Sequence, residues 1–370
     1  MARIAINGFG RISRLAFRAA WQQQLSLELV AINDPAGAHT DALLLEFDSN
    51  YGPFPAKVES DEGSIRVDGK PIMVFRERDW TKLNWSDLGA EIVLECSGRG
   101  TRRQEASKHL AAGAKRVLIS APAKDEDLTV VLGVNEGLYD PELHRIISNG
   151  SCTTNCLAPV TKVLLNAFGI QWGFMSTVHS YTNSQHIHDR GTEDQRESRA
   201  AALNIIPTDT GAARALVKVI PELAGRFNGM AFRVPTPTVS VIDLVAELDR
   251  SVTIEEVNGA FREAAKGPLR GILEVCDRPL VSMDFKGNPH SAIVDALSTM
   301  VLRDRIVKVV AWYDNEWGYS CRMADLAAYV TAKDIQRDQQ RIWGVAREKK
   351  PTSTAHEGGI RALDPHRGNQ

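Results

Sequence analysis

The sequence has no excess of charge of either sign and no long apolar run. Lys and Arg total 44 and Asp and Glu total 46, so the net charge is -2. A balanced surface does not favour nucleic acid, and no acidic block indicates a solvating tail. No apolar stretch approaches the roughly 18 residues that cross a bilayer. The first eight residues also lack the regions of a signal peptide. We therefore expect no membrane and no required nucleic acid partner.

Cysteine is scarce as well. The five cysteines are odd in number and scattered through the chain, at Cys96, Cys152, Cys156, Cys276 and Cys321. This pattern argues against a disulfide framework and predicts reduced thiols in a cytoplasm. No group of Cys and His residues has the spacing of metal ligands, so no metal site is predicted.

The arrangement of apolar runs predicts two domains, in line with roughly 100–200 residues per domain. In the first third, short buried strands alternate with helices, which is typical of a doubly wound parallel sheet. The expected strands are 3–7, 27–33, 92–97, 116–120 and 129–134, and the expected helices are 13–23 and 101–112.

Beyond Cys152 the pattern changes to a mixed α+β catalytic domain. A helix at 153–168 precedes longer strands at 172–180, 230–235, 240–248 and 306–313. We therefore predict a dinucleotide-binding domain at 1–151 with a returning helix at 319–332. A catalytic domain at 152–318 and a polar C-terminal extension at 333–370 complete the division.

The first expected strand leads into Gly8-Phe9-Gly10-Arg11-Ile12-Ser13. This run matches the G-x-G-x-x-G fingerprint, with Ser13 at the third glycine position. The first two glycines permit a tight turn and let backbone N–H groups approach a pyrophosphate. Asp34 closes the second strand roughly 20 residues later, where a carboxylate binds the ribose 2′-hydroxyl. The pair predicts NAD as cofactor, with NADP as the alternative.

A thiol nucleophile is predicted at Cys152. It follows cap residues and precedes an apolar helical stretch, so it falls at a helix N-terminus. The partial positive charge there favours a thiolate and predicts a lowered pKa. His179 ends an expected strand and can form a thiolate–imidazolium pair with Cys152. Cys156, one turn further on, is expected to be a packing thiol.

The run Ser151-Cys152-Thr153-Thr154-Asn155-Cys156 closely resembles the glyceraldehyde-3-phosphate dehydrogenase family. The resemblance extends from Gly8-Phe9-Gly10-Arg11 to Tyr313-Asp314-Asn315-Glu316-Trp317, about nine tenths of the chain. It implies that Cys152 attacks an aldehyde, that His179 takes a proton, and that inorganic phosphate cleaves the resulting thioester. A homotetramer acting in glucose metabolism on a small phosphorylated aldehyde is also implied.

The resemblance further assigns binding residues by position. Those implied to hold the substrate phosphate or the attacking phosphate are Ser151, Thr153, Thr182, Ser184, Thr210, Gly211 and Arg233. Those implied to contact the dinucleotide are Gly8, Phe9, Gly10, Arg11, Ile12, Asp34, Arg78, Ser97, Gly98, Ser120 and Asn315.

The sequence departs from the family pattern in the loop 186–196, which lacks the usual proline, and at Ser180-Tyr181-Thr182-Asn183. Three other functions therefore stay open. One is an erythrose-4-phosphate dehydrogenase, in which water resolves the thioester, because Asn288-Pro289-His290 resembles that branch. Another is a role with arsenate, because Asn33-Asp34-Pro35-Ala36-Gly37 resembles members associated with arsenate resistance. The third is a non-catalytic dinucleotide- or RNA-binding protein, which would not need all four of Cys152, His179, Thr182 and Arg233.

Overall fold

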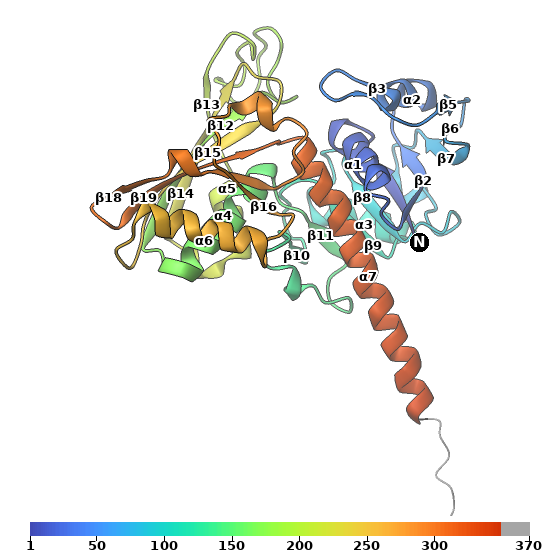
Figure 1. Ribbon diagram of the computed structural model, residues 1–370. Coiled ribbons are helices and arrows are strands. Elements are labelled where there is room, and N and C mark those ends of the chain that lie inside the picture. Colours follow the sequence, from blue (N-terminus) through green and yellow to red (C-terminus); the bar gives the residue numbers. More distant parts are fainter. Residues whose placement is uncertain (349–370) are drawn as a thin grey trace, which may run out of the picture.

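The computed structural model describes residues 1–348, which form two large β-sheets with helices packed against them (Figure 1). The nine-stranded first sheet has the order β10-β11-β9-β8-β1-β2-β7-β6-β5. Seven of its strands, from β10 to β7 in this order, are mutually parallel. Strand β6 pairs antiparallel with β7 on one side and with β5 on the other. The bounds are β1 (Ala2–Asn7), β2 (Leu27–Asn33), β5 (Val58–Ser60), β6 (Ser64–Val67), β7 (Lys70–Phe75), β8 (Ile92–Glu95), β9 (Arg116–Ile119), β10 (Leu128–Thr129) and β11 (Ile146–Ser148).

Helices cover both faces of the first sheet. Helices α1 (Arg11–Gln22), α2 (Ala38–Glu46) and α7 (Trp317–Glu348) supply apolar residues to the cluster on one face. Helix α3 (Arg103–Ala111) and the segment around Trp80 and Trp85 pack on the other face. A small hairpin of β3 (Phe47–Asp48) and β4 (Gly52–Pro53) follows α2. The prediction of a doubly wound parallel sheet is confirmed.

The second sheet has eight strands in a mixed arrangement. Seven have the order β13-β14-β12-β15-β19-β17-β16, and β18 pairs with β19. Helices α4 (Cys152–Phe168), α5 (Ala212–Val219) and α6 (Ile254–Lys266) pack beneath one face and close the larger core (Figure 1). The strands are β12 (Trp172–Ser180), β13 (Ile206–Asp209), β14 (Phe227–Val234), β15 (Ser240–Glu247), β16 (Leu273–Cys276), β17 (Ala292–Asp295), β18 (Met300–Leu302) and β19 (Ile306–Tyr313).

The structure differs from the sequence-based expectation at the 129–134 run. Only Thr129 of this run lies in a strand, and β11 was not predicted. The side chain of Asn135 accepts from the backbone N–H of Val131 at 2.8 Å and donates to the carbonyl of Thr129 at 2.8 Å. This amide takes the place of a strand partner, so the apolar run folds as a buried turn.

The last helix also differs from expectation, because α7 continues through Glu348 rather than ending near 332. Asp334 accepts from Arg116 and Tyr139, which anchors the helix beyond that point. In Figure 1 the end of α7 projects from the body of the molecule. Residues 349–370 of the expected polar extension lie outside the described residues. No helix in the described part is long and apolar enough to cross a membrane.

Candidate active site

The glycine-rich loop connects β1 to the N-terminus of α1. Gly8 has a φ of 87°, and a Cβ there would lie 2.5 Å from the Cα of Ser97, so only glycine fits. A Cβ at Gly10 would meet nothing within 4 Å, which leaves an open cradle at the helix end. Ser13 is fully buried and donates its hydroxyl to the carbonyl of Gly8 at 2.7 Å. The residue at the third glycine position thus ties the loop back on itself.

The side chains of Arg11 and Phe9, both predicted to contact the dinucleotide, are engaged within the protein. The Arg11 guanidinium is held by Glu316 at 2.5 and 2.6 Å and by Asp48 at 2.9 and 3.2 Å. The side chain of Phe9 is buried in the core of the first sheet, and its N–H donates to Asp34 at 2.7 Å. Of these groups, only the backbone N–H of Arg11, at the start of α1, has no partner within its helix and suits a pyrophosphate.

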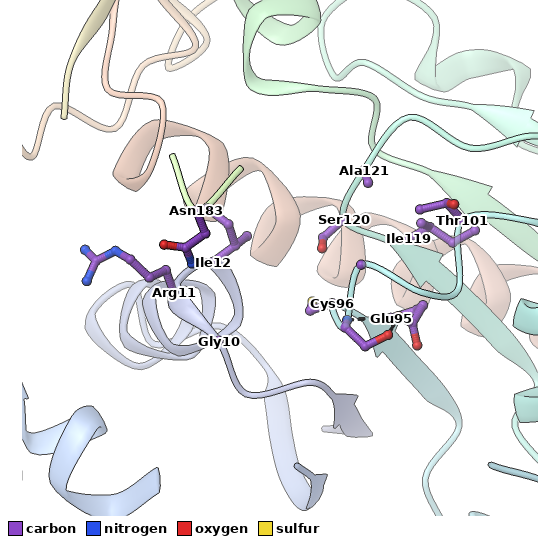
Figure 2. Close-up of a pocket in the computed structure, with 12 residues that line it drawn as sticks. Gly10, Arg11, Ile12, Glu95, Cys96, Thr101, Ile119, Ser120, Ala121 and Asn183 are labelled. Carbon is purple, nitrogen blue, oxygen red and sulfur yellow. Dashed lines mark hydrogen bonds between the residues drawn. The ribbon is translucent and has the colours of Figure 1, made fainter. Parts of the chain in front are cut away.

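The predicted cofactor residues gather at the carboxyl ends of the parallel strands. One cavity is lined by Gly10, Arg11, Ile12, Ser97, Gly98 and Ser120, with Asn183 reaching in from the loop after β12. Figure 2 shows Asn183 beside Ile12, and Cys96 and Ser120 on the far side of the opening. A second cavity contains Asp34 and Arg78 together with Gly8 and Gly10. Dinucleotides bind at this edge of a doubly wound sheet, so the residues fit the group.

A buried polar network beneath this cleft was missed by the sequence analysis. Glu95 at the end of β8 accepts from the N–H and hydroxyl of Ser97 at 2.9 and 2.5 Å. Its other oxygen accepts from Asn7 at 2.5 Å and lies 3.0 Å from Nε2 of His109. Trp85 donates to Nδ1 of His109 at 3.2 Å, so Nε2–H points to the carboxylate. The network fixes the Ser97 turn.

Cys152 is the first residue of α4, as predicted. Ser151 caps the helix by accepting from the N–H of Thr154 at 3.0 Å. The sulfur of Cys152 lies 3.4 Å from Nε2 of His179, which stands near the end of β12. Cys156 is completely buried in the core, in agreement with a packing role. The structure therefore brings the predicted nucleophile and base into contact.

Arg233 approaches His179 from the neighbouring strand, because β12 and β14 pair these two residues directly. Its Nη1 lies 2.6 Å from Nδ1 of His179, which is also 2.7 Å from the carbonyl of Ser180. A guanidinium keeps its protons in proteins. Nδ1 therefore accepts from Arg233 rather than donating to Ser180, and the proton of the neutral ring sits on Nε2, facing the sulfur. The Nε of Arg233 is buried without a partner in the described residues, so it is available to an anion.

Burial works against charge on both catalytic groups. It raises the pKa of the Cys152 thiol, and the positive charge of Arg233 and a bond from Thr153 partly offset this rise. Burial, followed by the charge of Arg233, lowers the pKa of His179 to about 3. The prediction of a lowered thiol pKa is therefore wrong, because burial outweighs the groups that favour the thiolate. A thiolate here needs the attraction of a neighbouring imidazolium, whereas the contacts of Arg233 hold a neutral imidazole ring.

Other predicted phosphate ligands lie in the loop after β12 and at the start of α5. The hydroxyls of Thr182 and Ser184 lie 3.0 Å apart in the loop after β12. Thr210 accepts from the N–H of Ala212 at 3.2 Å, and Gly211 caps α5, whose N-terminus carries free N–H groups.

The hydroxyl of Thr153, a residue implied to line a phosphate site, has a partner within the protein. Its side chain is 4% exposed and bonds to the hydroxyl of Tyr313 at 2.8 Å. Tyr313 also bonds to Thr177 at 2.9 Å. The side chain of Thr153 therefore fastens the start of α4 to the second sheet, a role that sequence spacing could not indicate.

Asn315 stands where the two sheets meet. Its Oδ1 accepts from the hydroxyl of Ser240 at 2.9 Å, and the same hydroxyl accepts from the N–H of Ser180 at 3.1 Å. One serine thus connects Asn315 to the residue that follows His179. In the described residues no group of three or more His, Cys, Asp or Glu side chains could hold a metal ion.

A dinucleotide-type cleft and a cysteine–histidine pair in one chain are typical of oxidoreductases that work through a thiol. Family models described as "Glyceraldehyde 3-phosphate dehydrogenase, NAD binding domain" and "Glyceraldehyde 3-phosphate dehydrogenase, C-terminal domain" match residues 2–103 and 151–315. The chain belongs to the glyceraldehyde-3-phosphate dehydrogenase family, and its first sheet is an NAD-binding domain.

Individual relatives support this assignment. Glyceraldehyde-3-phosphate dehydrogenase of Geobacillus stearothermophilus is 56% identical over 333 residues, 90% of this chain and 99% of the relative. Glyceraldehyde-3-phosphate dehydrogenase 1 of Bacillus subtilis shows the same identity and coverage. The chloroplastic glyceraldehyde-3-phosphate dehydrogenase A of Chlamydomonas reinhardtii is 54% identical over 335 residues, 90% of this chain and 89% of the relative.

Proposed function

We propose that this chain catalyses the phosphorylating oxidation of D-glyceraldehyde 3-phosphate to 1,3-bisphosphoglycerate, with NAD as the hydride acceptor. The observation that carries the proposal is the 3.4 Å approach of the Cys152 sulfur and His179 Nε2 at the N-terminus of α4. In the first step the sulfur bonds to the aldehyde carbon, and the thiol proton passes through His179 to the carbonyl oxygen.

The resulting thiohemiacetal then loses a hydride from carbon, while His179 takes the hydroxyl proton and a thioester forms. The bound dinucleotide supplies the hydride acceptor. A phosphate oxygen finally bonds to the thioester carbon, the C–S bond breaks, and the sulfur regains a proton. Because the thioester retains the energy of the oxidation, the acyl phosphate can form.

The contacts of His179 support a role for the substrate phosphate in preparing the base. Arg233 bonds to Nδ1 of His179 and so places the ring proton on Nε2, where His179 cannot accept from Cys152. A phosphate that draws Arg233 away would free Nδ1 to donate to the carbonyl of Ser180, 2.7 Å away. Nε2 would then be unprotonated and ready to act as a base. Arg offers the forked geometry that suits a phosphate.

The remaining ligands divide between two anions. We propose that Thr182, Ser184 and Arg233 hold the substrate phosphate. Ser151, Thr210 and Gly211 lie at the N-termini of α4 and α5, which favour anions, and they would receive the attacking phosphate. The two sheets support a division into 1–151 with the returning helix 319–332 for the cofactor, and 152–318 for chemistry.

Assembly and location also belong to the proposal. The face of the second sheet opposite α4, α5 and α6 carries exposed apolar side chains, among them Trp172, Phe174, Val178 and Met230. Such a face is typical of a subunit interface, and it supports a homotetramer. The five cysteines are all unpaired, which supports a reducing compartment such as the cytoplasm.

Steady-state rates on two aldehydes, each with and without inorganic phosphate, test the proposed reaction. We expect a phosphate-dependent rate on glyceraldehyde 3-phosphate that exceeds the rate on erythrose 4-phosphate. A faster, phosphate-independent rate on the four-carbon sugar would instead establish the erythrose-4-phosphate reaction. Arsenate in place of phosphate is expected to support turnover, since it can occupy the same pocket.

A further inference from the structure

One carboxyl group behind the Asp34 pocket has no role in the proposed reaction. Asp41 is the fourth residue of α2, which begins directly after the turn that follows Asp34, and its N–H donates to the carbonyl of Gly37 at 3.0 Å. Its side chain is 1% exposed and lines neither of the two cofactor cavities. The Oδ2 of Asp41 is buried and has no hydrogen-bond partner among residues 1–348. A charged carboxylate is costly in such surroundings, which favour the neutral acid.

Two charged side chains act on Asp41 from other elements, Asp34 after β2 and Arg14 on α1. Phe9 connects these two residues, because its N–H donates to Asp34 at 2.7 Å and its carbonyl accepts from Nη1 of Arg14 at 2.7 Å. The Nε of Arg14 is buried without a partner in the described residues, so it does not bond to Oδ2 of Asp41. Asp41 therefore senses both charges, while its Oδ2 receives no bond from the arginine.

Charged side chains on the other elements that pack against α2 have partners of their own. Glu59 on β5 and Arg66 on β6 are about half exposed, and each forms an ion pair at the surface. Asp48 on β3 is held by Arg11 at 2.9 and 3.2 Å. The state of Asp41 is therefore governed by its burial and by the carboxylate and arginine described above.

These surroundings hold Asp41 between its two protonation states near neutral pH. Burial, followed by the negative charge of Asp34, raises the pKa of Asp41 to about 7, and the positive charge of Arg14 opposes this rise. A bound dinucleotide brings the negative charge of its pyrophosphate to the glycine-rich loop, where Phe9 and Asp34 meet. A nearby like charge favours the neutral form of a carboxyl group. Binding of the cofactor should therefore drive Asp41 toward its protonated form.

We infer that Asp41 couples dinucleotide binding to the uptake of a proton, so that the affinity of the protein for its cofactor falls as the pH rises through neutrality. The proton passes from the solvent to the carboxylate of Asp41, and no other bond forms or breaks. The inference goes beyond the proposed reaction, because it concerns the NAD-binding domain and does not depend on which aldehyde is oxidised.

Calorimetry on the full-length chain at pH 6, 7.5 and 8.5, in buffers of two ionisation enthalpies, measures both the Kd and the protons taken up. The ligands are NAD and ADP-ribose, which lacks the nicotinamide and keeps a constant charge over this range. Asp41→Asn mimics the neutral acid, Asp41→Ala has no titratable group, and Glu46→Gln removes a charge elsewhere on α2 as a control. We expect the Kd for both ligands to rise about threefold or more from pH 6 to pH 8.5 in the unmodified protein and in Glu46→Gln, within the limit of about tenfold per pH unit that one linked proton sets. Both Asp41 variants should lose most of this rise and most of the proton uptake at pH 7.5.

Three results would overturn the inference. The first is a Kd that does not rise with pH in the unmodified protein, and the second is a rise of the same size in both Asp41 variants. The third is loss of the rise in Glu46→Gln, because the net charge of α2 rather than its buried carboxyl group would then explain the effect. Proton uptake that depends on Asp41 in a protein without aldehyde oxidation would leave this inference standing and remove the proposed reaction.

Discussion

Replacement of His179 by asparagine separates the two effects that act on the Cys152 thiol. The sulfur and Nε2 are 3.4 Å apart. Two unit charges at this separation attract by about 5 kcal/mol at an effective dielectric constant of 20. The depression of the His179 pKa from 6.5 to about 3 corresponds to a cost of about 5 kcal/mol at roughly 1.4 kcal/mol per pKa unit. The attraction of a thiolate thus offsets most of the cost of charging the imidazole, so each charged group is favoured only beside the other.

His179→Asn removes the attraction and leaves the burial of the thiol. We expect alkylation of Cys152 by iodoacetamide at pH 7 to slow by at least about tenfold, and the midpoint of its pH profile to rise. Loss of a general base typically lowers kcat by about 10²–10⁴-fold. The affinity for NAD should stay nearly unchanged, because the cofactor cavities do not include residue 179.

Alkylation of the other cysteines is controlled for by His179→Asn combined with Cys152→Ser. An alkylation rate at pH 7 that is the same in His179→Asn as in the unmodified protein would refute the reasoning. It would mean that the helix end and Arg233 alone hold the thiolate.

Three further outcomes are expected. Cys152→Ser should lower turnover by orders of magnitude with nearly unchanged NAD affinity by calorimetry; comparable turnover would contradict a thiol mechanism. Gly8→Ala should lower the free energy of unfolding, measured in urea, by about 3 kcal/mol, because its methyl would lie 2.5 Å from a neighbouring backbone carbon. Gly10→Ala should fold normally and lose NAD affinity. Equal stability of the two variants would contradict this prediction. Burial raises the pKa of Asp48, but bonds from Arg11 outweigh it and hold that pKa below its ordinary value of 3.8. The Arg11–Asp48 pair therefore stabilises the fold fully above about pH 4, and its contribution falls as the pH drops further. Arg11→Ala should therefore lower the unfolding free energy by about 1–3 kcal/mol at pH 7 and by less at pH 3, and a pH-independent loss would contradict the linkage.

The sequence predicts most of the parallel sheet because its signals are local. The strand that precedes Gly8 and the strand that ends before Asp34 are each marked by an apolar run and a turn. The same signal fails at 129–134, where the side chain of Asn135 satisfies backbone groups that a strand would have paired. The extent of α7 was also underestimated, since bonds to Arg116 and Tyr139 anchor it through Asp334. Those partners are about 200 residues away in the sequence.

The candidate site shows the same limit. Cys152 could be predicted because a helix start is readable locally, whereas His179 was singled out by a strand end together with the family resemblance. The contact of the Thr153 side chain with Tyr313 could not be predicted, because Tyr313 is 160 residues away in the sequence. Nor could the Glu95 network, which depends on strands meeting at one edge of the sheet.

The side chain of Ser240 connects Asn315 with the strand end that carries His179. A single buried hydroxyl on β15 contacts both Asn315 and the backbone that continues from the catalytic imidazole. These two bonds tie the amide of Asn315 to the backbone next to His179. In the proposed reaction the hydride leaves the carbon and the proton leaves the attached hydroxyl, so a fixed spacing of these two residues suits both transfers.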